Sequence, residues 1–141
     1  MEQRKKALKC LSLKQPYAEL VAAGRKTIET RTWKTNFRGK FLIHASKTID
    51  KDSSDILNID CNKLTRGAVI GLAFLYDVKK YSAKQDFVAD KDKHFSSSFS
   101  ETKYGFLLKD AKKLNKPIPL AGKLGFFEVK ESIIWEQKID I

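Results

Sequence analysis

The sequence predicts a small α+β protein, a mixed β barrel of five or six strands with a few short helices flanking it. Two observations carry this prediction: short segments with strand-like patterns recur along the chain, and the first helix lies between the first two of them. At 141 residues, the chain is expected to form one domain, residues 1–141, with a core large enough to fold without metal or disulfide staples.

The first half of the chain carries the clearest patterns. Residues 9–13 are expected to form a short strand, followed by a helix from Pro16 to Ala23 that Gly24 ends in a left-handed conformation. A second strand is expected over residues 27–33 and a third over 40–46. Residues 67–78 are the most hydrophobic segment and predict a central strand that is covered on both faces.

The second half is predicted from weaker patterns. Ser82 and Gln85 have the spacing of a capping box, which predicts a helix from Ser82 to about Lys93. Residues 103–108 are expected to form a strand, Pro117 and Pro119 to break the chain, and residues 122–129 to form the last strand. The polar segment 47–66 is assigned no function.

One short segment concentrates chemically useful side chains. Side chains two residues apart on an extended strand share a face, so Thr27, Glu29, Arg31 and Trp33 are expected in one row while Ile28 points to the core. A polar row with an apolar anchor is typical of the wall of a binding site. A purely structural salt bridge between Glu29 and Arg31 explains the pattern equally well.

The positive charge is concentrated near the N-terminus. The net charge is +11, and residues 1–47 hold twelve lysines and arginines against three glutamates. Such a field attracts polyanions, nucleic acid most commonly and an anionic membrane surface less often. The charge therefore predicts a nucleic-acid partner, RNA preferred and DNA possible, although a lysine-rich surface also simply solubilises a protein.

Several other classes are not expected. Cys10 and Cys61 belong to no metal-binding pair, and His44 and His94 lie near neither of them in sequence, so no metal site and no cofactor are predicted. We interpret both cysteines as reduced thiols and His44 as a satisfied sheet residue. The apolar runs are too short to span a bilayer, and we expect a cytoplasmic protein, as a monomer, without membrane contact.

Four motifs spread over nearly the whole chain are Ser12-Leu13-Lys14-Gln15-Pro16-Tyr17-Ala18, Gly24-x-Lys26-x-x-Glu29-x-Arg31-x-Trp33, Arg66-Gly67-Ala68-Val69-Ile70-Gly71, and Tyr104-Gly105-Phe106 with Pro117-Ile118-Pro119-x-x-Gly122-x-x-Gly125. Together they resemble the ASCH domain, a branch of the PUA-like superfamily. The resemblance implies a pseudo-barrel with flanking helices and a basic cleft that takes RNA or sometimes DNA.

A nucleotide in such a cleft needs cations for phosphate, a flat group for stacking and a hydrogen-bonding group for the base edge. Lys14, Lys26 and Arg31 are candidates for the phosphate, Trp33 or Tyr104 for stacking, and Glu29 for an exocyclic amine. Trp33 and Tyr104 are each more often core residues than stacking platforms. The predicted nucleic-acid-binding residues are Lys14, Gln15, Lys26, Glu29, Arg31, Trp33 and Tyr104.

Catalysis is the alternative reading, and the sequence leaves it open. Some small proteins similar to ASCH domains are amidohydrolases that remove the acetyl group from N-acetylated cytidine, using a lysine in this motif, a threonine three residues later and a distant glutamate. Here Lys26 matches but Glu29 stands at the threonine position. Other family members are reported to cut RNA. A metal-independent hydrolase acting on RNA or modified nucleosides would use Glu29 as base and Lys26 to stabilise negative charge.

Overall fold

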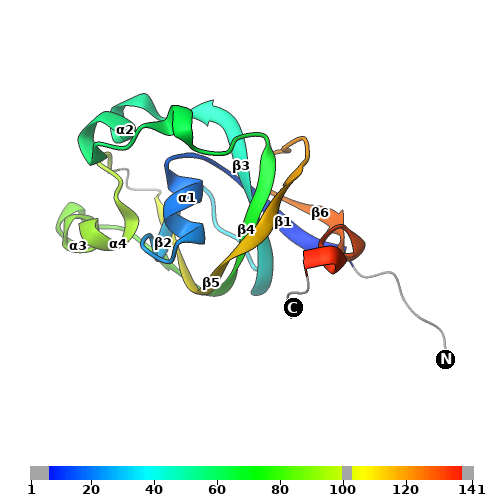
Figure 1. Ribbon diagram of the computed structural model, residues 1–141. Coiled ribbons are helices and arrows are strands. Elements are labelled where there is room, and N and C mark those ends of the chain that lie inside the picture. The colour runs from blue at the N-terminus through cyan, green and yellow to red at the C-terminus, as the bar shows by residue number, and fades with distance from the viewer. Residues whose placement is uncertain (1–6, 100–102, 138–141) are drawn as a thin grey trace.

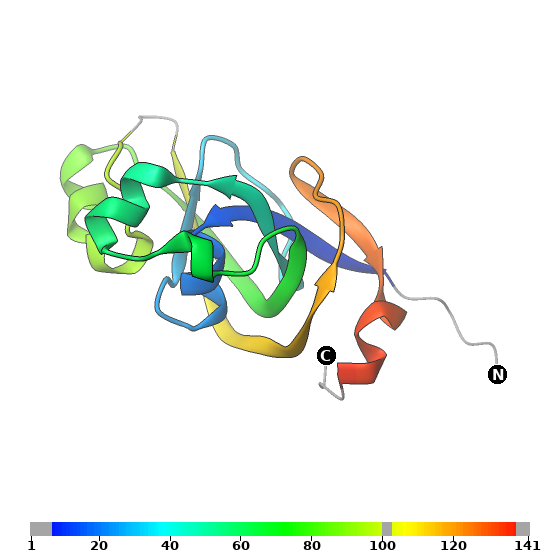
Figure 2. The ribbon, with the colours of Figure 1, turned by 45° about the horizontal axis from the view of Figure 1, so that its top comes forward.

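The structure, a computed structural model, describes residues 7–99 and 103–137. Its centre is a mixed six-stranded sheet in the order β2-β5-β4-β3-β1-β6, in which β1 and β3 are parallel and the other neighbours are antiparallel. Figures 1 and 2 show this sheet curling into a pseudo-barrel, which confirms the predicted fold class. The strands are β1 Ala7–Gln15, β2 Ile28–Arg31, β3 Gly39–Ile49, β4 Ala68–Lys80, β5 Tyr104–Pro119 and β6 Phe126–Lys130.

Short helices flank the sheet. Helix α1 packs against β1, β3, β4 and β5, and it ends where Gly24 adopts a φ of 78°, as predicted. Helices α2, α3 and α4 lie together at one end of the barrel in Figure 1, away from β6. The helices are α1 Tyr17–Ala22, α2 Lys51–Leu57, α3 Lys84–Ala89 and α4 Lys91–His94, with 3-10 turns η1 Cys61–Lys63 and η2 Glu131–Gln137.

The sheet is buried on both faces because its strands alternate between two hydrophobic clusters. On β1, Leu11 and Leu13 join the cluster that packs around α1, whereas Cys10 belongs to the cluster that packs against η2. On β3, Phe41 joins the cluster around α1 and Leu42 joins the cluster against η2. The strands that carry the site are therefore held rigidly from two sides.

Two predictions for the second half of the chain are wrong. Strand β5 does not stop near residue 108 but continues through Pro117 and Pro119, because β2 pairs only with residues 104–107. The far half of β5 has β4 on one side and an open edge on the other, where a missing N–H is tolerated.

The predicted capping box is also absent. Helix α3 begins after Ala83 without a side-chain cap, and the expected single helix divides into α3 and α4 at Asp90. The Asp90 carboxylate accepts hydrogen bonds from the Tyr81 hydroxyl at 2.5 Å and the Lys79 ammonium at 2.7 Å. Burial acts to raise the pKa of Asp90, but these two partners outweigh it and hold that pKa below its usual value.

Candidate nucleotide-binding cavity

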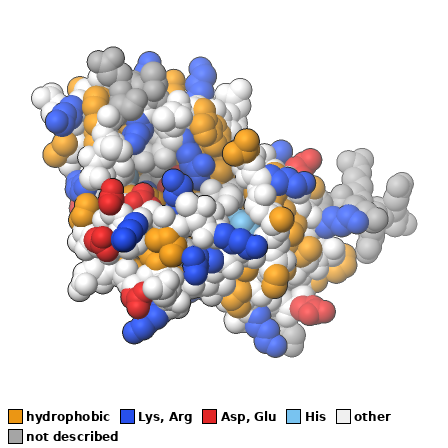
Figure 3. Space-filling view, turned by 90° about the horizontal axis from the view of Figure 1, so that it is seen from above, with side chains coloured by type: hydrophobic (Ala, Val, Ile, Leu, Met, Phe, Trp, Pro, Cys, Tyr) orange, Lys and Arg blue, Asp and Glu red, His pale blue; other side chains and the backbone are white. Residues whose placement is uncertain are grey.

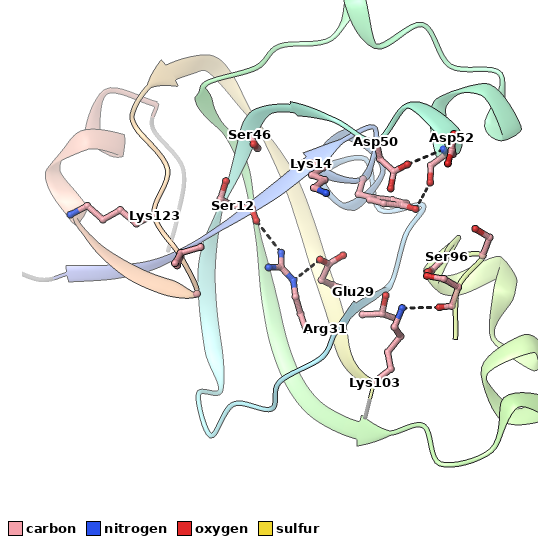
Figure 4. A pocket seen from close by; sticks show the side chains of 17 residues that line it. Ser12, Lys14, Glu29, Arg31, Ser46, Asp50, Asp52, Ser96, Lys103 and Lys123 are labelled. Carbon is pink, nitrogen blue, oxygen red and sulfur yellow. Dashed lines mark hydrogen bonds and ion pairs between the residues drawn. The ribbon is translucent and has the colours of Figure 1, made fainter. Parts of the chain in front are cut away.

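A polar cavity of about 570 Å³ brings together segments that are far apart in the sequence. Its walls come from β1, the start of α1, β2, β3, the start of α2, residues 96–98, the residue before β5 and the tip of the β5–β6 loop. Figure 4 shows Arg31 and Glu29 near the centre, Asp50 and Asp52 on the α2 side, and Lys123 on the opposite side. The volume lies in the range of about 300–1,000 Å³ usual for small-molecule sites.

The floor of the cavity is an ion pair that also bridges two strands. Arg31 Nε donates to Glu29 Oε2 at 2.8 Å, and Arg31 Nη2 donates to the Ser12 carbonyl at 2.9 Å. Strands β1 and β2 are not neighbours in the sheet, so the Arg31 guanidinium joins them at this point. Because only 6% of Glu29 is exposed, its carboxylate is held in one orientation at the cavity surface.

Lys26 lies beneath the cavity and does not line it. Its ammonium donates to the carbonyls of Ile28 at 2.8 Å and His94 at 2.5 Å, lies 3.4 Å from Glu29 Oε1, and sits 4.8 Å from the centre of the Tyr17 ring. Burial lowers the pKa of Lys26, and the neighbouring Glu29 carboxylate only partly opposes it. With 2% of the residue exposed, Lys26 holds other segments in place and is not positioned to touch phosphate.

The α2 side of the cavity is formed by a capped helix start. Asp50 Oδ1 accepts from the Ser53 N–H at 3.0 Å, and the Ser53 hydroxyl forms a short hydrogen bond with the Tyr17 hydroxyl. Burial raises the pKa of Tyr17, so its hydroxyl stays protonated at neutral pH. This side offers hydroxyls and carboxylates but few cations.

Cations lie on the remaining walls. Lys14 and Lys123 are exposed and form no ion pair with any residue in the described ranges 7–99 and 103–137. Lys103 Nζ donates to the Ser98 carbonyl at 2.7 Å, and burial lowers the pKa of Lys103. Figure 3 shows lysine and arginine side chains spread over one face of the molecule, with a smaller acidic group on its left side.

The predicted site residues therefore divide into two groups. Lys14, Glu29 and Arg31 line the cavity together. Gln15 is fully buried, where its amide donates to the Thr65 carbonyl at 2.8 Å, and it does not line the cavity. The other three that do not line it are Lys26, Trp33 and Tyr104.

Both aromatic candidates pack against the core. Trp33 makes edge-to-face contacts with Phe106 and Phe126, at 5.3 and 6.1 Å between ring centres. Tyr104 packs against the same hydrophobic cluster. Among the described residues, the aromatic side chain that lines the cavity is Tyr17, which the sequence analysis named only within the first motif.

Sequence reasoning missed the residues contributed by polar segments. Asp50, Asp52 and Ser53 come from a stretch that was assigned no function, and Ser96 to Ser98 from a serine-rich loop. No local pattern marks either segment. The available signal was the run of serines and aspartates itself, since hydroxyls and carboxylates need partners.

His44 is a satisfied sheet residue, as predicted. Its Nδ1 lies 2.8 Å from Ser12 Oγ and its Nε2 lies 2.6 Å from the Leu120 carbonyl oxygen. Because a carbonyl only accepts, Nε2 carries the proton and Nδ1 accepts from Ser12 when the ring is neutral. Both cysteines are free and buried.

Residues 7–99 and 103–137 contain neither a cluster of metal-ligating side chains nor a membrane-spanning helix. No group of three or more His, Cys, Asp or Glu residues is placed there to hold a metal ion. No helix in that part of the chain is both long and apolar enough to cross a membrane.

A mixed pseudo-barrel with short flanking helices and a polar cavity at its first two strands defines a PUA-like α+β domain. Residues 11–118 match the model of the ASCH domain, and the chain belongs to that family. Among curated proteins, none matches the sequence.

Solved structures agree with this assignment at the level of the fold. The crystal structure of ASCH from Zymomonas mobilis is similar with a TM-score of 0.65 and 18% identity, over 96% of this chain and 94% of that one. A serine-to-alanine mutant of the same protein has a TM-score of 0.65 and 19% identity, over 94% of each chain. A tyrosine-to-phenylalanine mutant has a TM-score of 0.65 and 18% identity, over 94% of this chain and 96% of that one. At these identities the likeness concerns the fold alone.

Proposed function

We propose that this ASCH domain binds nucleic acid, RNA in preference to DNA, by placing one unpaired nucleotide in the cavity. The observation that carries the proposal is the Glu29–Arg31 pair at the floor of a nucleotide-sized cavity whose outer walls hold Lys14, Lys103 and Lys123. The buried Glu29 carboxylate would accept hydrogen bonds from the edge of a base, and the lysines around it would bind the phosphates on either side of that base.

Phosphate binding falls to the lysines on the walls. Within residues 7–99 and 103–137, Lys14 and Lys123 form no ion pair. The Lys103 ammonium has three donors, one of which binds the Ser98 carbonyl. Phosphates are unfavourable next to Asp50 and Asp52, because like charges repel. The strand is therefore expected to follow the lysines, with the base directed toward the carboxylates.

The base would be recognised by Glu29 and Tyr17. Arg31 donates to one Glu29 oxygen and the Lys26 ammonium lies 3.4 Å from the other. Because each carboxylate oxygen has two lone pairs, Glu29 keeps acceptor capacity for an exocyclic amine. The Tyr17 ring offers a surface for stacking, and base stacking on an aromatic residue contributes about 1–3 kcal/mol.

The preference for RNA rests on the hydroxyls around the cavity. Ser46, Ser53 and the serines at 96–98 can each donate to or accept from a ribose 2′-hydroxyl. DNA lacks that group, so DNA of the same sequence would form none of these additional hydrogen bonds.

The test is binding of labelled single-stranded RNA and DNA of one sequence, measured by anisotropy between about 50 and 200 mM salt. The double variant Lys14→Ala/Lys123→Ala is expected to weaken RNA binding and to reduce the slope of log K against log salt by about 1.4, since each phosphate contact adds about 0.7 for single strands. The control Lys112→Ala/Lys116→Ala removes the same charge from residues that do not line the cavity. An equal change of slope in both variants would remove the support for this site.

Metal-independent hydrolysis is the second candidate, and the observation that favours it is the nearly buried Glu29 carboxylate at the cavity floor. A positioned carboxylate can act as a general base toward a ribose hydroxyl or a water, with Arg31 or Lys103 near the developing charge. Incubation with single-stranded RNA and with acetylated cytidine, followed by mass spectrometry, tests this. Products that form with the wild type and disappear with Glu29→Gln would establish catalysis, and intact substrates would leave binding alone.

A further inference from the structure

The loop between β5 and β6 places an exposed apolar side chain at the cavity. Leu124 is 98% exposed and lines the cavity together with Lys123 and Gly125. Of the exposed large hydrophobic side chains in residues 7–99 and 103–137, Leu124 alone lines it; the others, Ile56, Tyr76, Val88 and Trp135, are 47–68% exposed. The exposed leucine thus coincides with the site.

The base of this loop is fixed to the barrel. The Leu120 carbonyl accepts from His44 Nε2 at 2.6 Å, and the Leu120 N–H donates to the Gly67 carbonyl at 3.2 Å. Gly122 lies so close to His44 that an added Cβ would be 2.9 Å from the ring. Leu124 is therefore carried on an anchored support, and its position relative to Arg31 and Glu29 is set by the barrel.

A leucine in water gains free energy when it is covered by an apolar surface, and the faces of stacked bases are such a surface. When a nucleotide leaves a duplex and enters a pocket, it leaves a gap in the stack, and filling that gap with an apolar side chain offsets part of the cost of unstacking. Lys123, next in sequence, is placed to meet the adjacent phosphate.

We propose that Leu124 is a wedge that inserts between bases, so that the cavity takes its nucleotide from base-paired RNA and not only from single strands. This proposal rests on the proposed function, because a wedge is useful only if the cavity holds a nucleotide. The wide, shallow minor groove of A-form RNA is the face that admits such a loop. Leu124 is then a residue that determines which form of RNA is bound.

The experiment compares two RNA probes: a short duplex with 2-aminopurine opposite a mismatch, and the matching single strand. Anisotropy gives the two affinities, and 2-aminopurine fluorescence, which rises when the base leaves the stack, reports flipping. The variants are Leu124→Ser, Leu124→Met and the control Val88→Ser, which removes a side chain 56% exposed that does not line the cavity. Because Leu124 contacts little in the free protein, its variants are expected to fold normally.

Wild type is expected to raise the fluorescence of the duplex probe. Leu124→Ser should lower the ratio of duplex to single-strand affinity about tenfold, the lower end of what burying a leucine is worth, and abolish the fluorescence rise. Leu124→Met and Val88→Ser should keep both. A Leu124→Ser protein with the ratio and fluorescence of wild type would overturn the wedge.

The wedge and the proposed function fail differently. Salt-dependent binding of the single strand, with duplex binding that leaves the fluorescence unchanged, would refute the wedge and retain the cavity. A wild-type protein that binds neither probe would refute both proposals.

Discussion

Replacing Arg31 with methionine tests whether its guanidinium joins β1 to β2. Methionine keeps most of the packing volume but removes the bonds to Glu29 and to the Ser12 carbonyl, which measure 2.8 and 2.9 Å. Hydrogen bonds to charged groups contribute about 1.5–3 kcal/mol each, and breaking a buried pair costs about 3–5 kcal/mol. Since the Arg31 side chain is 21% exposed, we take the low end of the range for a buried pair and expect the free energy of unfolding to fall by about 3 kcal/mol.

Urea unfolding measures this loss, and at about 3 °C per kcal/mol thermal unfolding should show a fall in Tm of about 10 °C. The matched control is Arg38→Met, because Arg38 pairs with Asp77 at 3.7 Å with both side chains largely exposed. An exposed pair contributes at most about 1 kcal/mol. A double-mutant cycle with Glu29→Gln separates the pair from the Ser12 contact. Equal losses for the two arginine variants would refute the bridging role.

Three further predictions concern buried groups. Burial holds the folded-state pKa of Lys26 below 10.5, so between the folded-state pKa and 10.5 the unfolded chain binds more protons and the stability of the wild type rises with pH. The loss of unfolding free energy caused by Lys26→Met, measured in urea, should therefore be larger just below pH 10.5 than at neutral pH. A loss that stays constant with pH would contradict the lowered pKa. Gly71→Ala should cost about 2 kcal/mol by thermal unfolding, because its Cβ would lie 2.5 Å from the Lys112 carbonyl oxygen; a wild-type Tm would disprove that contact. Burial raises the pKa of Cys10 to about 12, so iodoacetamide should leave Cys10 unmodified at neutral pH until urea unfolds the protein, and rapid alkylation of the folded form would count against this packing.

Local sequence patterns predicted the parts of the fold that neighbouring residues determine. Gly24 ends α1 because a left-handed residue is needed there. The alternation of side chains around Ile28 and Arg31 identified β2 as a strand with a polar face, and that face lines the cavity. The end of β5 was missed because the effect of Pro117 depends on a missing neighbour strand, which the sequence of β5 does not record.

The candidate site was predicted where the strand pattern applies and missed elsewhere. Glu29 and Arg31 lie on β2 and share the cavity, as side chains two apart should. Lys26 precedes β2, and its backbone N–H donates to the Leu20 carbonyl at the end of α1. Strand alternation therefore does not govern the direction of the Lys26 side chain. Ser96 donates its N–H to the ring of His94, and the His94 carbonyl accepts from Lys26, which lies 68 positions earlier in the sequence. No short-range pattern encodes that long-range contact, which holds this part of the cavity wall.

The buried ammonium of Lys26 affects how mutational data on this protein should be interpreted. Its bond to the His94 carbonyl, together with the Thr27 N–H bond to the Lys93 carbonyl at 3.0 Å, ties the start of β2 to the chain just before residues 96–98, the serine wall of the cavity. Removing the amine would release that wall, so inactivity of a Lys26 variant would not by itself make the lysine a chemical participant. Only probes of the reacting atoms, such as the pH profile of a Lys26 variant with its serine wall shown to be in place, can distinguish a scaffold from a catalyst here.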